Sequence, residues 1–195
     1  MAPFAGSRGR GWRGLLVGAP LCAVVLVGSS AGCTGKDPFN PGESLGTFRV
    51  TGALVSSTCG TTPNPWQFDV KLRHEAVTTL YWVQGGLPIS GKLDPVARSV
   101  MSATETRNMR AADAKTSRAA CNLVREDSLD VVLAPVTPPI TDVKTATSFK
   151  GTLKYRFSPT QGSECDDQLL DTGGDFAALP CEVSYTIEGT KTAEK

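Results

Sequence analysis

The chain has 195 residues, of which 20 are Lys or Arg and 19 are Asp or Glu, giving a formal net charge of +1. Residues 1–32 hold three of the basic residues and no acidic one, so 17 basic and 19 acidic residues follow them, a net charge of −2. Such near-neutrality gives no reason to expect nucleic acid or an anionic membrane face as a partner. The remaining length suits one domain of about 150 residues, which can bury close to 70% of its unfolded surface.

The first 32 residues have the pattern of a secretory signal peptide. Arg8, Arg10 and Arg13 give a positively charged start, an apolar run follows over residues 15–27, and small residues lead from there to Cys33. The apolar run has 13 residues, fewer than the roughly 20 that cross a bilayer as a helix. A charged start, a short apolar middle and a small-residue exit are typical of a signal peptide that is removed.

The residues Ser30-Ala31-Gly32-Cys33 resemble the lipobox of bacterial lipoproteins, with Ser30 where that family prefers Leu. In the family the cysteine thiol is acylated and becomes the new N-terminus. The resemblance therefore implies a membrane attachment through a lipid on Cys33, on the periplasmic side or at the surface of a bacterial cell envelope. This layout is similar to that of many envelope lipoproteins of Gram-negative bacteria. The alternative is an ordinary cleaved signal that leaves Cys33 as a spare thiol.

The segment after the lipobox predicts a flexible tether. Residues 33–47 are rich in Gly, Pro and polar residues and show no apolar period. Extended, about a dozen such residues reach some 40 Å, enough to hold a domain clear of the lipid headgroups. A single domain is expected over residues 48–190, followed by a polar tail at 191–195.

Alternation of apolar and polar residues predicts antiparallel strands throughout this domain. The clearest case has Trp66, Phe68, Val70 and Leu72 on one face and polar residues between them. Clusters of Gly, Pro and polar residues separate the strands. The predicted strands cover residues 48–54, 66–73, 80–83, 89–93, 100–106, 121–125, 129–133, 149–157 and 181–188.

Eight or nine strands joined by short turns, with no clear helix, predict an all-β antiparallel domain. Residues 126–128 are expected to form a turn within a hairpin, and residues 109–120 a short helix or an exposed loop. The consecutive hairpins favour a calycin-like up-and-down β-barrel, and a two-sheet β-sandwich is the alternative. The chain lacks the Gly-x-Trp opening of the lipocalins. Ala119 stands where an immunoglobulin-type sandwich carries a tyrosine two residues before its second cysteine.

The cysteines indicate disulfides in an oxidising compartment. Cys22 lies within the apolar run, and Cys33 would carry the lipid. Four cysteines then remain, Cys59, Cys121, Cys165 and Cys181. A zinc site is the competing use, but the chain has no Cys-x-x-Cys pair and a single histidine.

The pairing predicted for these four cysteines joins Cys165 to Cys181 and Cys59 to Cys121. Cys165 follows the strand that ends near Phe157, and Cys181 opens the last strand. If those two strands are antiparallel neighbours, a bridge across the base of their connecting loop is easy to close.

No residue set forms a catalytic signature. His74, the single histidine, lies at a predicted strand end and is expected to be solvated, without a nucleophile elbow elsewhere. Gly86, Gly91 and Lys92 match the start of a phosphate-binding loop, but Leu93 stands where Ser or Thr is required. The match is therefore attributed to chance.

Two further patterns are of the kind that can form binding features. A loop rich in acidic residues offers hard oxygen ligands for calcium, but its spacing matches no known calcium loop, so no metal site is predicted. Its acidic residues are Glu164, Asp166, Asp167, Asp171 and Asp175. Tyr81 and Trp82 lie on opposite faces of one strand; both are expected to be buried, the alternative being one exposed ring that stacks on a sugar or a partner.

The sequence thus predicts a lipid-anchored, all-β envelope protein that binds a small ligand or a glycan and needs no cofactor. The alternative is a structural or assembly lipoprotein that binds another envelope protein. A carboxylate-based hydrolase is a minor alternative, since such chemistry needs only two acids close in space. An eight-stranded barrel can be filled by side chains or leave room for one small ligand, and the sequence leaves this choice open.

Overall fold

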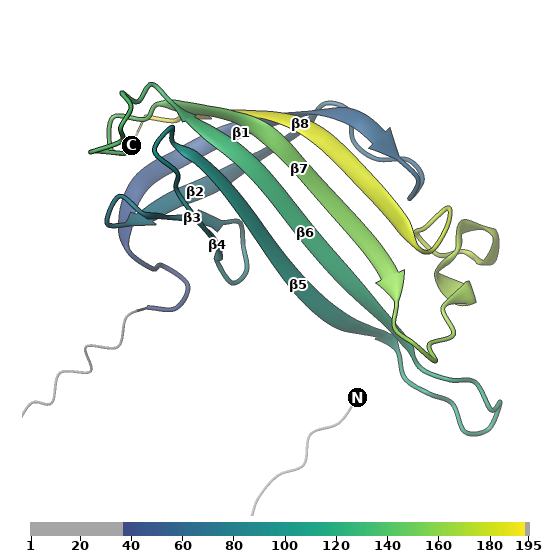
Figure 1. Ribbon diagram of the computed structural model, residues 1–195. Coiled ribbons are helices and arrows are strands. Elements are labelled where there is room, and N and C mark those ends of the chain that lie inside the picture. The colour runs from purple at the N-terminus through teal and green to yellow at the C-terminus, as the bar shows by residue number, and fades with distance from the viewer. Residues whose placement is uncertain (1–36, 194–195) are drawn as a thin grey trace, which may run out of the picture. The chain divides into compact units, whose positions relative to one another are not determined.

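The computed structural model of the chain describes residues 37–193 (Figure 1). The predicted signal peptide, the lipobox cysteine Cys33 and the first residues of the predicted tether lie outside this part. None of the helices in residues 37–193 is long and apolar enough to span a membrane.

The described residues form one antiparallel sheet of eight strands. Each strand pairs with the next in the chain, except that β1 also pairs with β8 and no ladder joins β4 to β5. The order across the sheet is therefore β4-β3-β2-β1-β8-β7-β6-β5. The strands are β1 (Glu43–Ser57), β2 (Trp66–Glu75), β3 (Thr79–Val83), β4 (Ile89–Lys92), β5 (Arg98–Arg110), β6 (Cys121–Ala134), β7 (Ser148–Pro159) and β8 (Cys181–Lys191).

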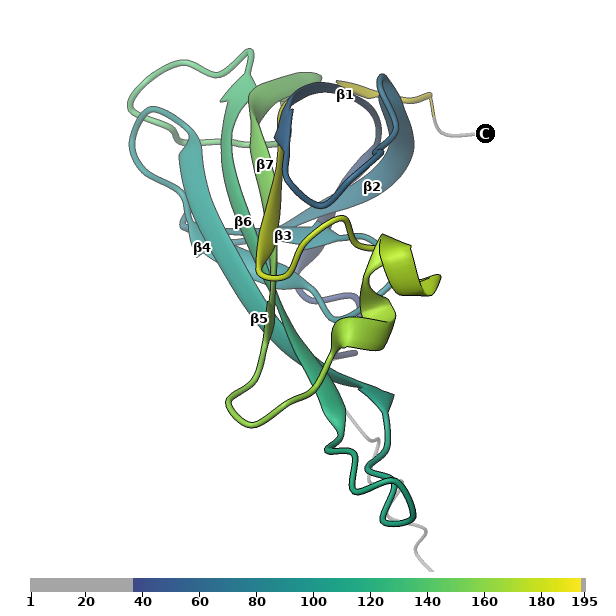
Figure 2. The ribbon, with the colours of Figure 1, turned by 90° about the vertical axis from the view of Figure 1, so that its right-hand side faces the viewer.

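The strongly curved β1 and β2 carry the sheet round until β4 comes beside β5, so the sheet is nearly closed into a barrel (Figures 1 and 2). A single isolated bridge, between Leu93 and Ser99, spans this seam within the described residues. The structure confirms the predicted up-and-down barrel, and the two-sheet sandwich does not occur.

The alternation of the sequence explains which face of each strand is inside. Phe48 and Val50 of β1, Leu72 of β2, Leu153 of β7 and Ile187 of β8 are all buried in the barrel. Because side chains alternate along a strand, the residues between them point outward, where they are mostly charged or hydroxylated.

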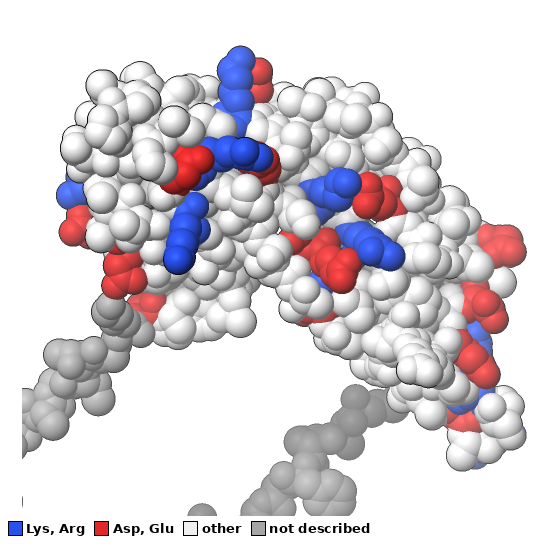
Figure 3. Space-filling model, viewed as in Figure 1, with Lys and Arg blue, Asp and Glu red and all other residues white. Residues whose placement is uncertain are grey.

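The charges on the outside are largely paired across neighbouring strands. Lys150 lies 3.0 Å from Glu188, and Lys154 lies 3.1 Å from Glu182. Blue and red side chains accordingly lie next to one another on the face shown in Figure 3. Exposed pairs of this kind contribute little stability, so the buried inner face is the main stabilising feature.

The two ends of the barrel differ. At the end that carries the chain ends, here called the base, Val143 and Ala146 of the loop between β6 and β7 are buried and cover the interior. A cluster of rings fills the barrel above them, with the Phe149 ring 5.6 Å from both Phe48 and Trp82. A Cβ on Gly189 would lie 2.1 Å from the Phe149 ring, so the glycine makes room for it.

The opposite end, here called the mouth, carries the β1–β2, β3–β4, β5–β6 and β7–β8 loops. Two 3₁₀ turns, η1 (Asp166–Gln168) and η2 (Leu170–Thr172), lie in the last of these loops. The loop packs on the barrel through Phe176, whose ring centre lies 5.2 Å from that of Phe157.

One predicted connection is wrong, and for another one of the two predicted alternatives is confirmed. Residues 126–128 form no turn: they lie in the middle of β6, a single strand that pairs with β5 over residues 121–132 and with β7 over residues 123–134. Of the two alternatives predicted for residues 109–120, the exposed loop is confirmed over residues 111–120, which hold one bridge between Asp113 and Arg118, while Met109 and Arg110 end β5.

The barrel extends beyond the predicted domain limits, residues 48 and 190, at both ends. β1 begins at Glu43 and buries Leu45, so the last five residues of the predicted tether belong to the barrel. Lys191, assigned to the polar tail, is the last residue of β8.

All four of the remaining cysteines form disulfides, as expected, but the predicted pairing is wrong. Cys59 is joined to Cys181, and Cys121 to Cys165. The predicted Cys165–Cys181 bridge rests on β8 being a neighbour of β7 and leaves out its other neighbour, β1. Because β1 closes the barrel against β8, Cys59 just beyond β1 lies beside the first residue of β8, with Cα atoms 5.0 Å apart. The two disulfides are compatible with an extracytoplasmic location.

Candidate functional site

A cavity of about 910 Å³ lies at the mouth of the barrel. It exists because β3 and β4 have only five and four residues, whereas β5, β6 and β7 have 13, 14 and 12. The three long strands continue past the β3–β4 hairpin, as Figure 1 shows, and part of their inner face is left uncovered. The lower barrel is filled by side chains, and the upper barrel is open.

The cavity has an apolar floor and an aromatic wall. Trp82, Leu129 and Leu153 are almost fully buried beneath it. Trp66 and Tyr155 rise from opposite sides of the barrel, and their ring centres are 6.0 Å apart. Such rings offer flat apolar surfaces with a polar edge, suited to the ring of an amphipathic ligand or a sugar.

Four charged side chains on the inner faces of β5 and β6 line the other wall of the cavity. On β6, the Arg125 guanidinium donates two hydrogen bonds to Asp127, at 2.7 and 2.8 Å. On β5, Arg107 donates two to Glu105, at 2.9 and 3.2 Å. Glu105 lies opposite Arg125 across the ladder, so unlike charges are neighbours along each strand and also across this pair.

The guanidinium of Arg125 also lies over the ring of Tyr155, 4.6 Å from its centre. A cation in this position is attracted by the electron-rich ring face. The contact fixes Arg125 between an aromatic ring and a carboxylate, which places a defined polar surface directly above the apolar floor.

The surroundings shift the pKa values of Arg125, Tyr155 and Glu105. Burial by itself would lower the pKa of Arg125, but the hydrogen bonds that its guanidinium donates to Asp127, together with the charge of that carboxylate, outweigh this and raise the pKa. Burial, helped by the Asp127 carboxylate, raises the pKa of Tyr155 above its ordinary value. The hydrogen bonds from Arg107 lower the pKa of Glu105. At neutral pH the cavity therefore presents two ion pairs and a neutral phenol.

No protein-family model, curated protein or solved structure matches this chain. The chemistry of the cavity is accordingly the basis for assigning a role.

Of the residues singled out in the sequence, Trp82 and Gly86 line the mouth cavity, and His74 and the acidic loop do not. His74, expected to be solvated, is buried at the base, because it continues the inward-facing series of Val70 and Leu72. Its Nδ1 lies 2.7 Å from the Ala76 carbonyl oxygen. Gly86, from the chance phosphate-loop match, lines the cavity as part of the β3–β4 turn.

In the acidic loop, Asp167 forms ion pairs with two arginines. Asp167 lies 2.9 Å from Arg110 and 3.2 Å from Arg118, and the Glu164 side chain accepts a hydrogen bond from the Ala119 amide. No group of three or more possible metal-ligating His, Cys, Asp or Glu residues occurs within residues 37–193. The expectation that both rings of the aromatic pair are buried is wrong for one of them. Trp82 is buried inside, whereas Tyr81 is half-buried on the outside, where its hydroxyl donates to Glu75.

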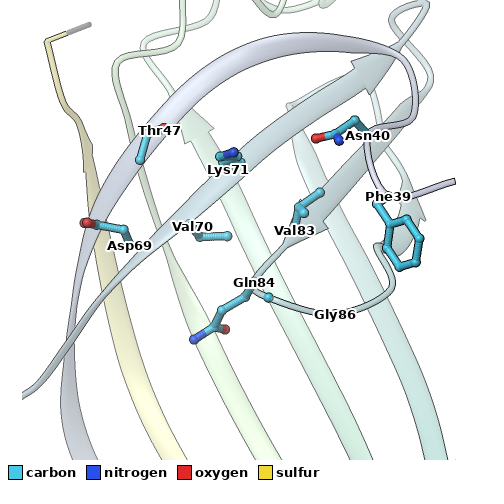
Figure 4. A pocket seen from close by; sticks show the side chains of 10 residues that line it. Phe39, Asn40, Thr47, Asp69, Val70, Lys71, Val83, Gln84 and Gly86 are labelled. Atoms are coloured by element: carbon cyan, nitrogen blue, oxygen red, sulfur yellow. The ribbon is translucent and has the colours of Figure 1, made fainter. Parts of the chain in front are cut away.

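A smaller hollow of about 330 Å³ lies on the other side of the β3–β4 turn. Figure 4 shows Phe39 and Asn40 of the N-terminal segment on one side of it, and Asp69 and Lys71 of β2 on another. Residues 84–86 line both hollows. The smaller one has neither the aromatic wall nor the row of ion pairs, so the mouth cavity is the stronger candidate.

Sequence reasoning missed the charged wall, although a signal was present. Arg125 and Asp127 stand in phase with Leu123 and Leu129, which are buried inside. Charges in phase with a buried face indicate that part of this face borders water, whereas the prediction ends a strand at Arg125 and assigns Asp127 to a turn.

Proposed function

We propose that the chain is a lipid-anchored protein of the bacterial cell envelope that binds a small amphipathic ligand or a glycan in the mouth of its barrel. The observation that carries this proposal is the mouth cavity, with its apolar floor, aromatic wall and two ion pairs. Its volume of about 910 Å³ falls within the range typical of small-molecule sites, which are mostly apolar with a few placed polar groups.

The anchor part of the proposal rests on the sequence. A signal peptide over residues 1–32 would deliver the chain across a membrane, and acylation of Cys33 would hold it on the periplasmic side or at the cell surface. The two disulfides support a location outside the cytoplasm, because such bonds persist in oxidising compartments.

Binding is favoured over catalysis by the state of the two carboxylates in the cavity. A glycosidase acid must stay protonated near neutral pH, which requires a raised pKa. Glu105 has a lowered pKa, and Asp127 accepts two hydrogen bonds from Arg125. A purely structural lipoprotein would have no need for an open, polar-walled cavity.

Ligand binding can be tested with the full chain in mild detergent and a panel of neutral amphipathic molecules and short glycans. A true ligand should change the emission of Trp66 and Trp82, which line the cavity, and should raise the melting temperature progressively, with the logarithm of its concentration once this exceeds the Kd. Trp66→Phe should reduce the emission change. If emission and melting temperature stay constant with every member of the panel, the proposal is wrong.

A further inference from the structure

One edge of β5 is free over most of its length. β5 pairs with β6 from Arg98 to Arg110. On its other side it meets β4 only near its start, where Leu93 bridges to Ser99 and a Cβ on Gly91 would lie 2.4 Å from the Val100 carbonyl oxygen. Within residues 37–193 no strand pairs with this edge over residues 102–110. A long exposed edge of this kind is a template for another strand.

The backbone groups that face the free edge can be identified from the hydrogen bonds at the start of β5. Arg98 directs its N–H to the Asp94 carboxylate and accepts from the Asp94 amide, on the β4 side. The Ala97 carbonyl oxygen accepts from Leu133 on the β6 side. The directions of the backbone N–H and C=O groups alternate along a strand. The backbone groups of the even-numbered residues therefore point to the free edge. They are Ser102, Thr104, Thr106 and Asn108.

This edge is complementary to itself. If two copies pair antiparallel about a two-fold axis at Thr106, the hydrogen-bonded pairs fall on even-numbered residues, and Glu105 lies opposite the second copy's Arg107. An axis at Glu105 would place Glu105 opposite the Glu105 of the second copy. An axis at Arg107 would place Arg107 opposite the Arg107 of the second copy. Like charges directly opposite each other are destabilising, and unlike charges stabilise.

Two further observations agree with an axis at this position. The free stretch, residues 102–110, is itself centred on Thr106. The Glu105 and Arg107 side chains are 56% and 63% exposed and pair with one another in the single chain, so each can exchange its partner for one in the second copy without losing a charge pair.

We propose that the chain forms a two-fold dimer in which the β5 edges of two copies pair antiparallel about Thr106. The occupant of the edge is a second copy of this chain, because the charge pattern matches its own sequence. Each copy would then bring a Glu105–Arg107 pair to the rim of the other's mouth cavity. The inference is independent of which ligand the cavity holds, since it rests on the backbone and charge pattern of β5.

Charge reversal tests this pairing, with sedimentation of the full chain in mild detergent as the measurement. Glu105→Arg or Arg107→Glu alone should weaken dimerisation about tenfold or more, because each creates two like-charge oppositions. The double variant, and an equimolar mixture of the two single variants, should regain it. Lys150→Glu, on the exposed outer face of β7, should have no effect. A wild-type chain that stays monomeric, or a double variant as weak as the singles, overturns the proposal.

A crosslink tests the register without relying on affinity. Hydrogen-bonded partners in antiparallel strands have Cα atoms about 5.5 Å apart, within disulfide range. Thr106→Cys should therefore give a disulfide-linked dimer on a non-reducing gel, whereas Thr152→Cys, exposed on β7, should not. A dimer formed equally by both variants, the absence of a Thr106→Cys dimer, or a crosslink to a different protein overturns it.

Discussion

At the scale of single residues, the inner face of the barrel separates into two chemistries along the same strands. β7 carries Phe149 and Leu153 in the filled lower half, and Tyr155 and Phe157 beside the cavity. β6 changes from Leu129 to Asp127 and Arg125 at the same height. The point at which side chains stop being apolar marks the floor of the cavity.

The packed half should respond to the loss of side-chain volume. Leu153 is 1% exposed, so Leu153→Ala should lower the free energy of unfolding by about 2–5 kcal/mol through lost burial and a residual cavity. Lys154→Ala, on the outer face, removes an exposed ion pair and should cost less than about 0.5 kcal/mol. Urea unfolding of both variants measures the difference, and equal losses would show that the assigned faces are wrong.

The charged wall should depend on Arg125 more than on Arg107. The Asp127 side chain is only 15% exposed, so Arg125→Met leaves a largely buried carboxylate without its partner and should cost about 1–2 kcal/mol. Arg107→Met breaks an exposed pair and should cost under about 1 kcal/mol. The same urea experiment compares them, and a larger effect at Arg107 would contradict the described geometry.

The ionisation of the Tyr155 phenol at alkaline pH tests the burial of its side chain. Its pKa is raised by burial and by Asp127, so the folded state favours the protonated phenol. The stabilisation is therefore present below the ordinary tyrosine pKa of about 10 and is lost as the pH rises above it. Ultraviolet titration should show Tyr155 ionising only when the chain unfolds, and Tyr155→Phe should leave the titration near pH 10 unchanged. A smaller signal near pH 10 in that variant would refute this.

At the scale of strands and their connections, the sequence predicts strand positions correctly where the period-two alternation is strong. It predicts them wrongly where the alternation is interrupted. The strands around Phe68, Leu153 and Val183 were correctly predicted, because one face is apolar throughout. β6 was divided because its central residues are polar on both faces, beside a cavity that only the tertiary structure creates. The mouth cavity itself results from unequal strand lengths, which local patterns do not report.

The disulfide pairing was missed for a related reason. The pairing of β7 with β8 can be expected because the two strands follow one another in the chain. The pairing of β1 with β8 joins the two ends of the domain, and no local sequence pattern indicates it. It is this closure that brings Cys59 and Cys181 together across 122 residues.

The two disulfides should differ in their effect on stability. They close loops with sequence separations of 122 and 44 residues, for which chain entropy gives about 5 and about 4 kcal/mol. Replacing Cys59 and Cys181 by Ala should therefore destabilise at least as much as replacing Cys121 and Cys165. Urea unfolding of the two double variants tests this order, and peptide mapping without reduction tests the pairing. A peptide that joins Cys165 to Cys181 would contradict the structure.

At the scale of the whole molecule, the proposal combines an anchor, a short tether and a barrel with an open mouth. β1 begins at Glu43, so the segment between Cys33 and the barrel is shorter than the sequence predicts. Under the proposed anchoring, this shorter tether would keep the barrel and the proposed ligand closer to the membrane surface.

The anchor can be tested directly. Cys33→Ala removes the thiol that would receive the lipid, and the variant should stay unprocessed or become soluble. Phase partitioning in detergent compares it with the wild-type chain. Equal entry of both into the detergent phase, with the leader removed from both, would contradict acylation at Cys33.

The central claim is that the mouth cavity holds a small molecule. Native mass spectrometry of the full chain, purified from its own envelope, measures this most directly as the fraction of molecules that carry a bound mass released on denaturation. Ala103→Phe places a ring in the cavity, whereas Thr152→Phe adds the same ring on the exposed outer face of β7. Wild type and Thr152→Phe should carry the bound mass, and Ala103→Phe should lose it. A bound fraction that is equal in all three chains, or zero in all three, would contradict the claim.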